Sequence, residues 1–128
     1  MKRLFVTRTF LRWSRQSGVT NDALLDAVSE MDQGLTLADL GGRVFKKRVG
    51  LPGRGKRGGA RMIVATDRKQ PWFFLYGFGK NERTNIDAAE RRFFQEVAKD
   101  PLGFDDRQLE RALLAGELVE IGDGDKKA

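Results

Sequence analysis

Chemistry in this chain must come from few residue types, because the sequence contains no histidine and no cysteine. The usual general base near neutral pH and the commonest metal ligand are therefore missing. Basic side chains dominate residues 43–69 instead, where Asp67 is the only acid. A segment of one charge repels itself unless it faces an anion, and a phosphate backbone is the commonest such partner. The basic residues are Arg43, Lys46, Lys47, Arg48, Arg54, Lys56, Arg57, Arg61, Arg68 and Lys69.

The spacing of these residues predicts a cationic face on neighbouring strands. Lys46 and Arg48 are two positions apart, so they project from the same face of an extended strand. Arg61 opens the next predicted strand, and Lys80 follows a third strand that contains Tyr76. If the three faces coincide, the four cations converge. Tyr76 then either joins them or packs in the core.

A face of this kind can bind RNA and could also cleave it. RNA carries its own nucleophile, the 2′-hydroxyl, so an enzyme needs to remove its proton, stabilise the phosphorane and protonate the leaving 5′-oxygen. A lysine crowded by other cations has a lowered pKa and can act as the base, with Glu82 as the alternative. Arginine stays protonated and suits charge stabilisation. This chemistry needs no metal and no cofactor. Binding without catalysis stays open, and Glu82 could equally form an ordinary ion pair with Arg83 or a nearby lysine.

A glycine-rich basic loop is predicted at residues 50–59, which contain Pro52 and five glycines. Glycines let backbone amides approach a phosphate closely. The stretch GRGKRGG is not a nucleotide-binding P-loop, because it lacks the spacing and the Ser or Thr after lysine. Together with the preceding strand, the loop supplies the predicted RNA-binding residues Lys47, Arg54, Lys56 and Arg57.

The remaining elements are expected to form a scaffold for this face. Two amphipathic segments, the first ending near Gly18 and the second capped by Thr20, predict an N-terminal helical hairpin. Two further helices are expected near the C-terminus, and Thr84 with Asp87 predicts a capping box at the first of them, with Phe93 inward. A turn is expected at residues 41–42, and strands at residues 4–6, 43–49, 61–66, 72–78 and 118–121.

This order of elements predicts an α+β fold, with a small antiparallel sheet that carries helices on one face and the basic side chains on the other. The length of 128 residues fits a single domain, which we expect at residues 1–121, followed by a polar, frayed tail at residues 122–128. The net charge of +6 favours a nucleic-acid partner, although a basic protein can also bind an acidic one. Arg8 and Arg12 interrupt the N-terminal apolar run, so we expect neither a signal peptide nor a membrane span but a cytoplasmic protein.

Several of these motifs together resemble the RelE/ParE superfamily of type II toxins, and the HigB-like branch is the nearest. They are KKR at residues 46–48, PGRGKRGGAR at residues 52–61, GKNE at residues 79–82 and LAGEL at residues 114–118. The resemblance extends over most of the chain, and the expected order of elements matches the compact α+β fold of the family.

The resemblance implies a toxin that enters the ribosomal A site and cleaves mRNA during translation. It also implies a cognate antitoxin, often a helix-turn-helix repressor, through which the pair would contact operator DNA. Alternatives on the same fold are a ParE-like inhibitor of DNA gyrase and a catalytically silent nucleic-acid binder. Lys46, Arg48, Arg61 and Lys80 resemble the basic active-site residues of the family, and Lys56 and Arg57 resemble its loop near the RNA backbone.

One feature of the family is missing at its usual place. Many relatives carry a late tyrosine that stacks on a base, whereas the only tyrosine here is Tyr76, within a predicted strand.

Overall fold

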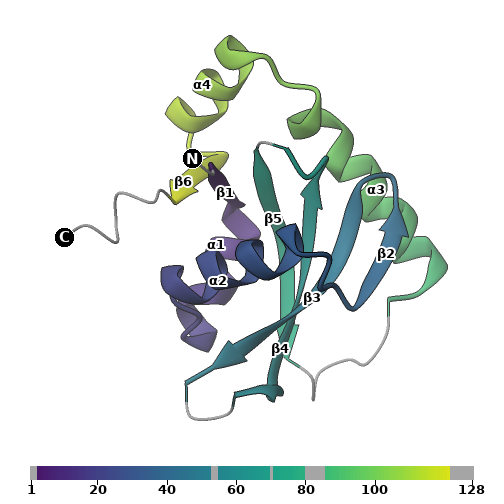
Figure 1. The fold of residues 1–128 in the computed structure, drawn as a ribbon. Helices are drawn as coiled ribbons and strands as arrows, with labels where there is room; N and C mark the ends of the chain where they lie inside the picture. Colours follow the sequence, from purple (N-terminus) through teal and green to yellow (C-terminus); the bar gives the residue numbers. More distant parts are fainter. Residues whose placement is uncertain (1–2, 53–54, 70, 80–85, 122–128) are drawn as a thin grey trace.

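The fold is that of a computed structural model, which describes residues 3–52, 55–69, 71–79 and 86–121, with the side chains of residues 55–58 outside that description. Its order of elements is that of an α+β fold, with consecutive strands between two pairs of helices (Figure 1). No helix in the described ranges is both long and apolar enough to cross a membrane. The elements are β1 (Leu4–Thr7), α1 (Arg8–Ser17), α2 (Asn21–Asp32), β2 (Ala38–Gly41), β3 (Val44–Leu51), β4 (Gly55–Thr66), β5 (Trp72–Gly79), α3 (Ala88–Leu102), α4 (Asp106–Leu114) and β6 (Leu118–Ile121).

The strands form one six-stranded sheet in the order β2-β3-β4-β5-β1-β6. β3, β4 and β5 are consecutive antiparallel neighbours, as predicted. β1, however, runs parallel to β5, so the prediction of an antiparallel sheet is wrong for the β1–β5 pair. Its other neighbour, β6, is antiparallel. Parallel neighbours require a long connection, and here the chain from α1 to β4 provides it.

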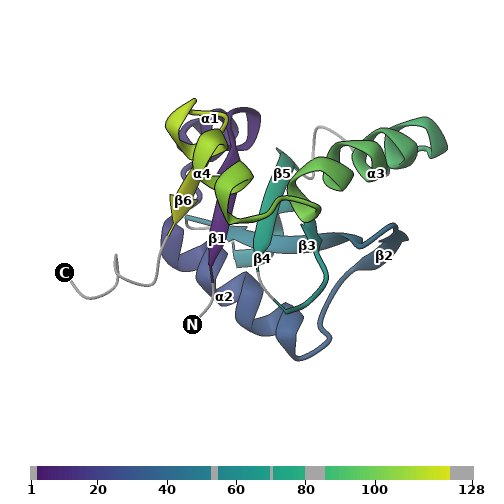
Figure 2. The same ribbon diagram turned by 90° about the horizontal axis from the view of Figure 1, so that it is seen from above.

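Helices cover both faces of the sheet, which corrects the prediction of helices on one face. On β3, Phe45 and Val49 belong to the core that α1 and α2 share, whereas Val44 belongs to the core beneath α3 and α4. Figure 2 shows α2 and α3 on opposite sides of the sheet. The cause is visible in β5, where six of the eight residues are buried. A strand that is apolar on both faces needs a covering layer on each.

The first N-terminal helix ends and the second begins as predicted, but the two helices lie on different strands. The Thr20 hydroxyl accepts a hydrogen bond from the Ala23 amide at 3.1 Å and caps α2. α1 lies on β5, and the Trp13 ring packs so closely on Gly77 that an added Cβ would lie 2.2 Å from the ring. α2 lies on β3 instead. Each helix therefore packs on its own strand, and their packing does not confirm the predicted hairpin.

The predicted start and inward face of α3 need correction. Asp87 is itself the N-cap, because its carboxylate accepts a hydrogen bond from the Glu90 amide and the Glu90 carboxylate accepts one from the Asp87 amide. The predicted box from Thr84 to Asp87 is therefore wrong, and Thr84 lies outside the described residues. Phe93 is 61% exposed while Phe94 is 5% exposed. The inward face thus lies one residue further along than predicted.

The strands next to the predicted loop are longer than expected. β3 runs to Leu51 and β4 begins at Gly55, and these two residues pair across the hairpin. The glycines of this stretch can adopt an extended conformation, and pairing with β3 satisfies their backbone groups. Residues 53–54 and the tail at residues 122–128 lie outside the described ranges.

The turn at residues 41–42 has the positive φ angles that favour glycine, and β2 precedes it as a strand that the sequence did not indicate.

Candidate nucleic-acid interface

Two rows of side chains define the candidate site on one face of β3, β4 and β5. In the first row Arg48 lies directly opposite Arg61, and Arg61 lies opposite Phe78. In the second row Lys46 lies opposite Ile63, which in turn lies opposite Tyr76. Side chains directly opposite each other on neighbouring strands share a face of the sheet, with Cβ atoms about 5 Å apart. The register therefore places Lys46, Arg48 and Arg61 on one face of the sheet, and their predicted roles in a site stay predictions.

The cations of this face differ in their exposure to solvent. Arg48 is exposed, whereas Lys46 and Arg61 are half-buried. Burial, and then the positive charge of Arg48, lower the pKa of Arg61 below its usual value. Arg61 donates a hydrogen bond to the carbonyl of Ala60 at 3.3 Å. Among the described residues, no acid forms an ion pair with any of these three cations. The face thus carries three positive charges, two of them on half-buried side chains, that no acid among the described residues neutralises.

Aromatic side chains form the floor of the site beside these cations. The half-buried Tyr76 ring lies 6.2 Å from the Phe78 ring and 5.5 Å from the Phe94 ring, measured between centroids. Phe78 is 2% exposed and belongs to the core beneath α3 and α4. Phe94 comes from α3, and sequence analysis missed it because the predicted inward face pointed to Phe93. The contact between the Tyr76 and Phe94 rings therefore packs α3 against the end of the row that begins with Lys46.

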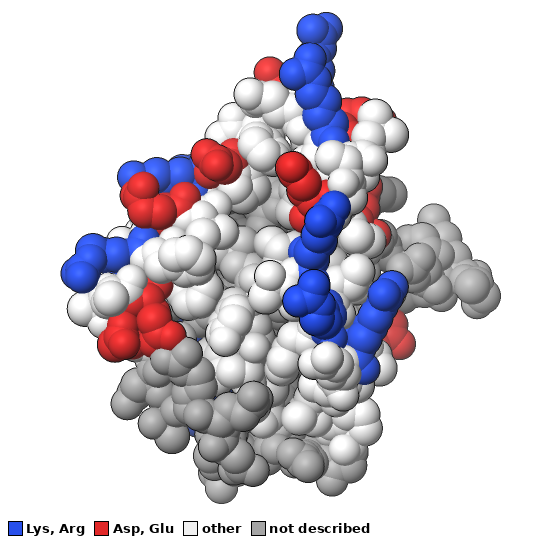
Figure 3. All heavy atoms as spheres, turned by 180° about the vertical axis from the view of Figure 1, so that it is seen from behind, with Lys and Arg blue, Asp and Glu red and all other residues white. Residues whose placement is uncertain are grey.

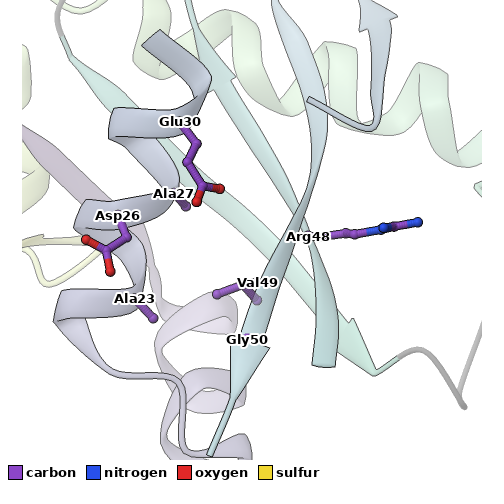
Figure 4. A pocket seen from close by; sticks show the side chains of 7 residues that line it. All are labelled: Ala23, Asp26, Ala27, Glu30, Arg48, Val49 and Gly50. Atoms are coloured by element: carbon purple, nitrogen blue, oxygen red, sulfur yellow. The ribbon is translucent and has the colours of Figure 1, made fainter. Parts of the chain in front are cut away.

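Lys47 lies apart from the other predicted residues. Its Nζ forms an ion pair with Oε1 of Glu30 at 2.6 Å, and the lysine is only 6% exposed. The side chain therefore points towards α2 and away from the cationic face, as strand alternation requires. Figure 4 shows the Arg48 side chain on the opposite face of β3, pointing away from α2 and Glu30. The predicted RNA-binding role of Lys47 does not fit this buried, paired position.

Arg68 is a second basic residue with partners inside the chain, although it is exposed to solvent. Its guanidinium lies 4.7 Å from the centre of the Phe45 ring, and Nη1 donates to the carbonyl of Met31 at 3.5 Å. Met31 stands in the last turn of α2, where the helix dipole favours a cation, and its carbonyl also accepts a hydrogen bond from the Gly34 amide at 2.9 Å. Lys47 and Arg68 therefore have partners inside the chain, whereas Lys46, Arg48 and Arg61 have no acidic partner among the described residues.

The remaining predicted residues cannot be placed on this face. Arg54, Lys80 and Glu82 lie outside the described residues, and the side chains of Lys56 and Arg57 do as well. The backbone of Lys56 and Arg57 belongs to β4. Their predicted roles stay predictions.

The described face can hold a phosphodiester and stabilise extra negative charge on it. Two guanidiniums from neighbouring strands can donate to non-bridging oxygens, and burial strengthens the attraction by lowering the local dielectric. Lys46 adds a third cation in the neighbouring row, and Tyr76 offers a partly exposed ring. Such a site suits an RNA backbone with an adjacent base.

Comparison with protein families gives a match that spans nearly the whole chain. A family model described as the RelE toxin of the RelE/RelB toxin-antitoxin system matches residues 2–121. The matched region contains every described strand and helix, including the three strands of the cationic face.

Proposed function

This chain belongs to the RelE toxin family, and from that premise we propose that it cleaves mRNA on the translating ribosome. A toxin of this family has a cognate antitoxin as its partner, which we propose to be a helix-turn-helix protein that also carries the pair to operator DNA. The HigB-like branch, the cytoplasmic location and the reaction below are parts of the same proposal.

The reaction uses the 2′-hydroxyl of the RNA as the nucleophile. Its oxygen attacks the adjacent phosphorus, the bond from phosphorus to the 5′-oxygen breaks, and the products are a 2′,3′-cyclic phosphate and a 5′-hydroxyl. Arg48 and Arg61 would hold the non-bridging oxygens and stabilise the phosphorane, where the negative charge is greatest. A lysine amine or a carboxylate would act as the general base that takes the proton from the nucleophile, and a protonated lysine would give a proton to the leaving 5′-oxygen. Lys46 is the described candidate, and Lys80 and Glu82 are the others.

The observation that supports this proposal best is the pairing of Arg48 with Arg61. Like charges directly opposite each other on a sheet destabilise it, and burial adds to the cost of the Arg61 charge. Their placement opposite each other is explained if a bound phosphate supplies the missing negative charge.

Primer extension on a reporter mRNA in a reconstituted translation system tests the proposal. Cuts that appear only in the presence of ribosomes are expected for the wild-type protein, with loss of the cuts in Arg61→Met. Arg92→Met is the matched control, because it removes an exposed arginine from α3 at the same cost in net charge. Intact message while the protein still stops growth would contradict the proposal and favour inhibition of gyrase. Intact message without toxicity would favour a silent nucleic-acid binder.

A further inference from the structure

Helix α1 carries a row of arginines that the candidate site does not use. Arg8, Arg12 and Arg15 follow one another at intervals of four and three residues, which places them on one side of a helix. The opposite side is buried, with Phe10 and Ser14 in the protein interior. All three arginines are exposed, so the row faces solvent.

The row is electrostatically unfavourable within the folded chain. α1 contains no acidic residue, whereas both C-terminal helices begin with carboxylates in their first turns. Like charges three and four residues apart destabilise a helix, and a cation in the first turn opposes the helix dipole. Two of the arginines also have a stabilising feature. Arg8 donates to the carbonyls of Gly116 and Ala115 at 2.7 and 3.1 Å, and Arg15 stands in the last turn, where the helix dipole favours a cation. Arg12 and Arg15 form no ion pair or side-chain hydrogen bond with the described residues.

The surroundings of the row fit a phosphate backbone better than a protein partner. A stable protein interface needs an apolar centre, and none of the large, exposed apolar side chains of the described chain comes from α1. The three arginines instead line a shallow depression with Leu11 and Gln16. Figure 3 views the molecule from behind, the side on which Figure 2 places α1, and shows Lys and Arg side chains in a column right of centre, with some Asp and Glu side chains beside it. Gly18, just after the helix, lies against Pro52 of the β3–β4 hairpin.

We infer that Arg12 and Arg15 form a second RNA-binding surface, which holds phosphates of a strand other than the one at Arg48 and Arg61. This deepens the proposed function, because the protein would then grip a structured RNA assembly at two places while only one of them performs chemistry. Arg8 hydrogen-bonds to the residues that follow α4, and its positive charge adds to the electrostatic potential around Arg12 and Arg15.

The test measures binding to a fluorescently labelled RNA in which every 2′-hydroxyl is methylated, so that cleavage is impossible. Affinity is followed by fluorescence anisotropy against salt concentration, in the absence of ribosomes. For single-stranded RNA each neutralised phosphate contributes about 0.7 to the slope of log affinity against log salt. The double variant Arg12→Ala/Arg15→Ala is expected to lower that slope by about 1.4.

Two further variants separate a phosphate contact from loss of charge in general. Arg91→Ala/Arg92→Ala removes two exposed arginines from α3 and should leave the slope as in wild type. Arg12→Lys/Arg15→Lys keeps the charge and should restore the slope. An unchanged slope in Arg12→Ala/Arg15→Ala, with the melting temperature as in wild type, overturns the inference. The inference is also overturned if this double variant keeps the wild-type slope but no longer binds an acidic protein that the wild type binds.

The outcome does not depend on the proposed reaction. A lowered slope in a protein that never cuts message would support the second surface and contradict the nuclease. Ribosome-dependent cuts with an unchanged slope would support the nuclease and contradict the second surface.

Discussion

Lys47 and Arg48 are neighbours on β3, yet the fold places their charges in opposite situations. Lys47 is buried under α2 and neutralised by Glu30, while Arg48 stands on the other face opposite a second arginine. The first arrangement satisfies a charge internally and stabilises the packing of a helix on a strand. The second leaves two positive charges to be satisfied by something outside the chain. Internal neutralisation therefore distinguishes structural cations from functional ones in this protein better than sequence position does.

The largest effect is expected from Arg61→Met, which removes the half-buried member of the arginine pair. Loss of one group that stabilises transition-state charge lowers the cleavage rate by about 100-fold to 1,000-fold in comparable sites. Stability should not fall. The pKa of Arg61 is lowered in the folded state, which means that folding disfavours its charged form, and methionine removes that charge. Cleavage rate and melting temperature are measured on the same preparation, and a strongly destabilised Arg61→Met would show that the arginine has a structural role.

Glu30→Gln tests the opposite situation on the same strand. The substitution leaves the Lys47 ammonium buried without its anion, and we expect a loss of about 3 kcal/mol in the free energy of unfolding. Urea denaturation gives this quantity directly. The catalytic rate per folded molecule should stay as in wild type, because the ion pair lies on the α2 side of the sheet. A drop in rate without a loss of stability would place Lys47 in the site after all.

Lys47→Met sharpens the same comparison with a smaller effect. Methionine keeps the apolar stem of the lysine, and the Glu30 side chain remains 25% exposed, so the carboxylate can reach water. We expect a cost of about 1 kcal/mol. The double variant Glu30→Gln/Lys47→Met should be no less stable than Lys47→Met alone, because the two residues act as a pair. Additive losses in the double-mutant cycle would contradict this account.

The smallest predicted effect concerns the α1 arginines. Arg12→Ala removes repulsion towards Arg8 and Arg15, so the protein should become more stable by about 0.3 kcal/mol. Thermal unfolding at low ionic strength reveals this gain, and added salt should reduce it. A clear loss of stability would mean that Arg12 has an internal partner and is not held for an external anion.

The sequence allowed the face of each β3 residue to be predicted, because alternation in a strand is a local rule. It placed Lys46 and Arg48 on one face correctly, whereas the predicted RNA-binding role of Lys47 ignored that alternation puts Lys47 on the other face. The pairing of Arg48 with Arg61 depends instead on where the hairpin closes, and the glycines around residues 53–59 left that position open. The ion pair between Lys47 and Glu30 joins residues 17 positions apart, for which no periodic signal exists.

The presence of helices on both faces of the sheet could have been predicted from the sequence. Residues 72–78 are apolar on both faces, which already contradicts a sheet with one free face. The parallel pairing of β1 with β5 could not have been predicted, since an apolar run of three residues does not reveal the direction of its partner strand. Assignment of the cationic face as a site needed the burial of Arg61 and the register of three strands, which appear only after folding.

The place of β1 between β5 and β6 also has a consequence for the order of folding. β3, β4 and β5 pair with their neighbours in sequence, so their contacts close short loops, whereas β1 must wait for β5 and then for β6. We expect the hairpins that bear Arg48 and Arg61 to form early and the sheet to be completed late, when the first and last described strands meet. The newly made chain would then carry its site before its final closure, and a partner that binds the unclosed chain would have a brief period in which to act.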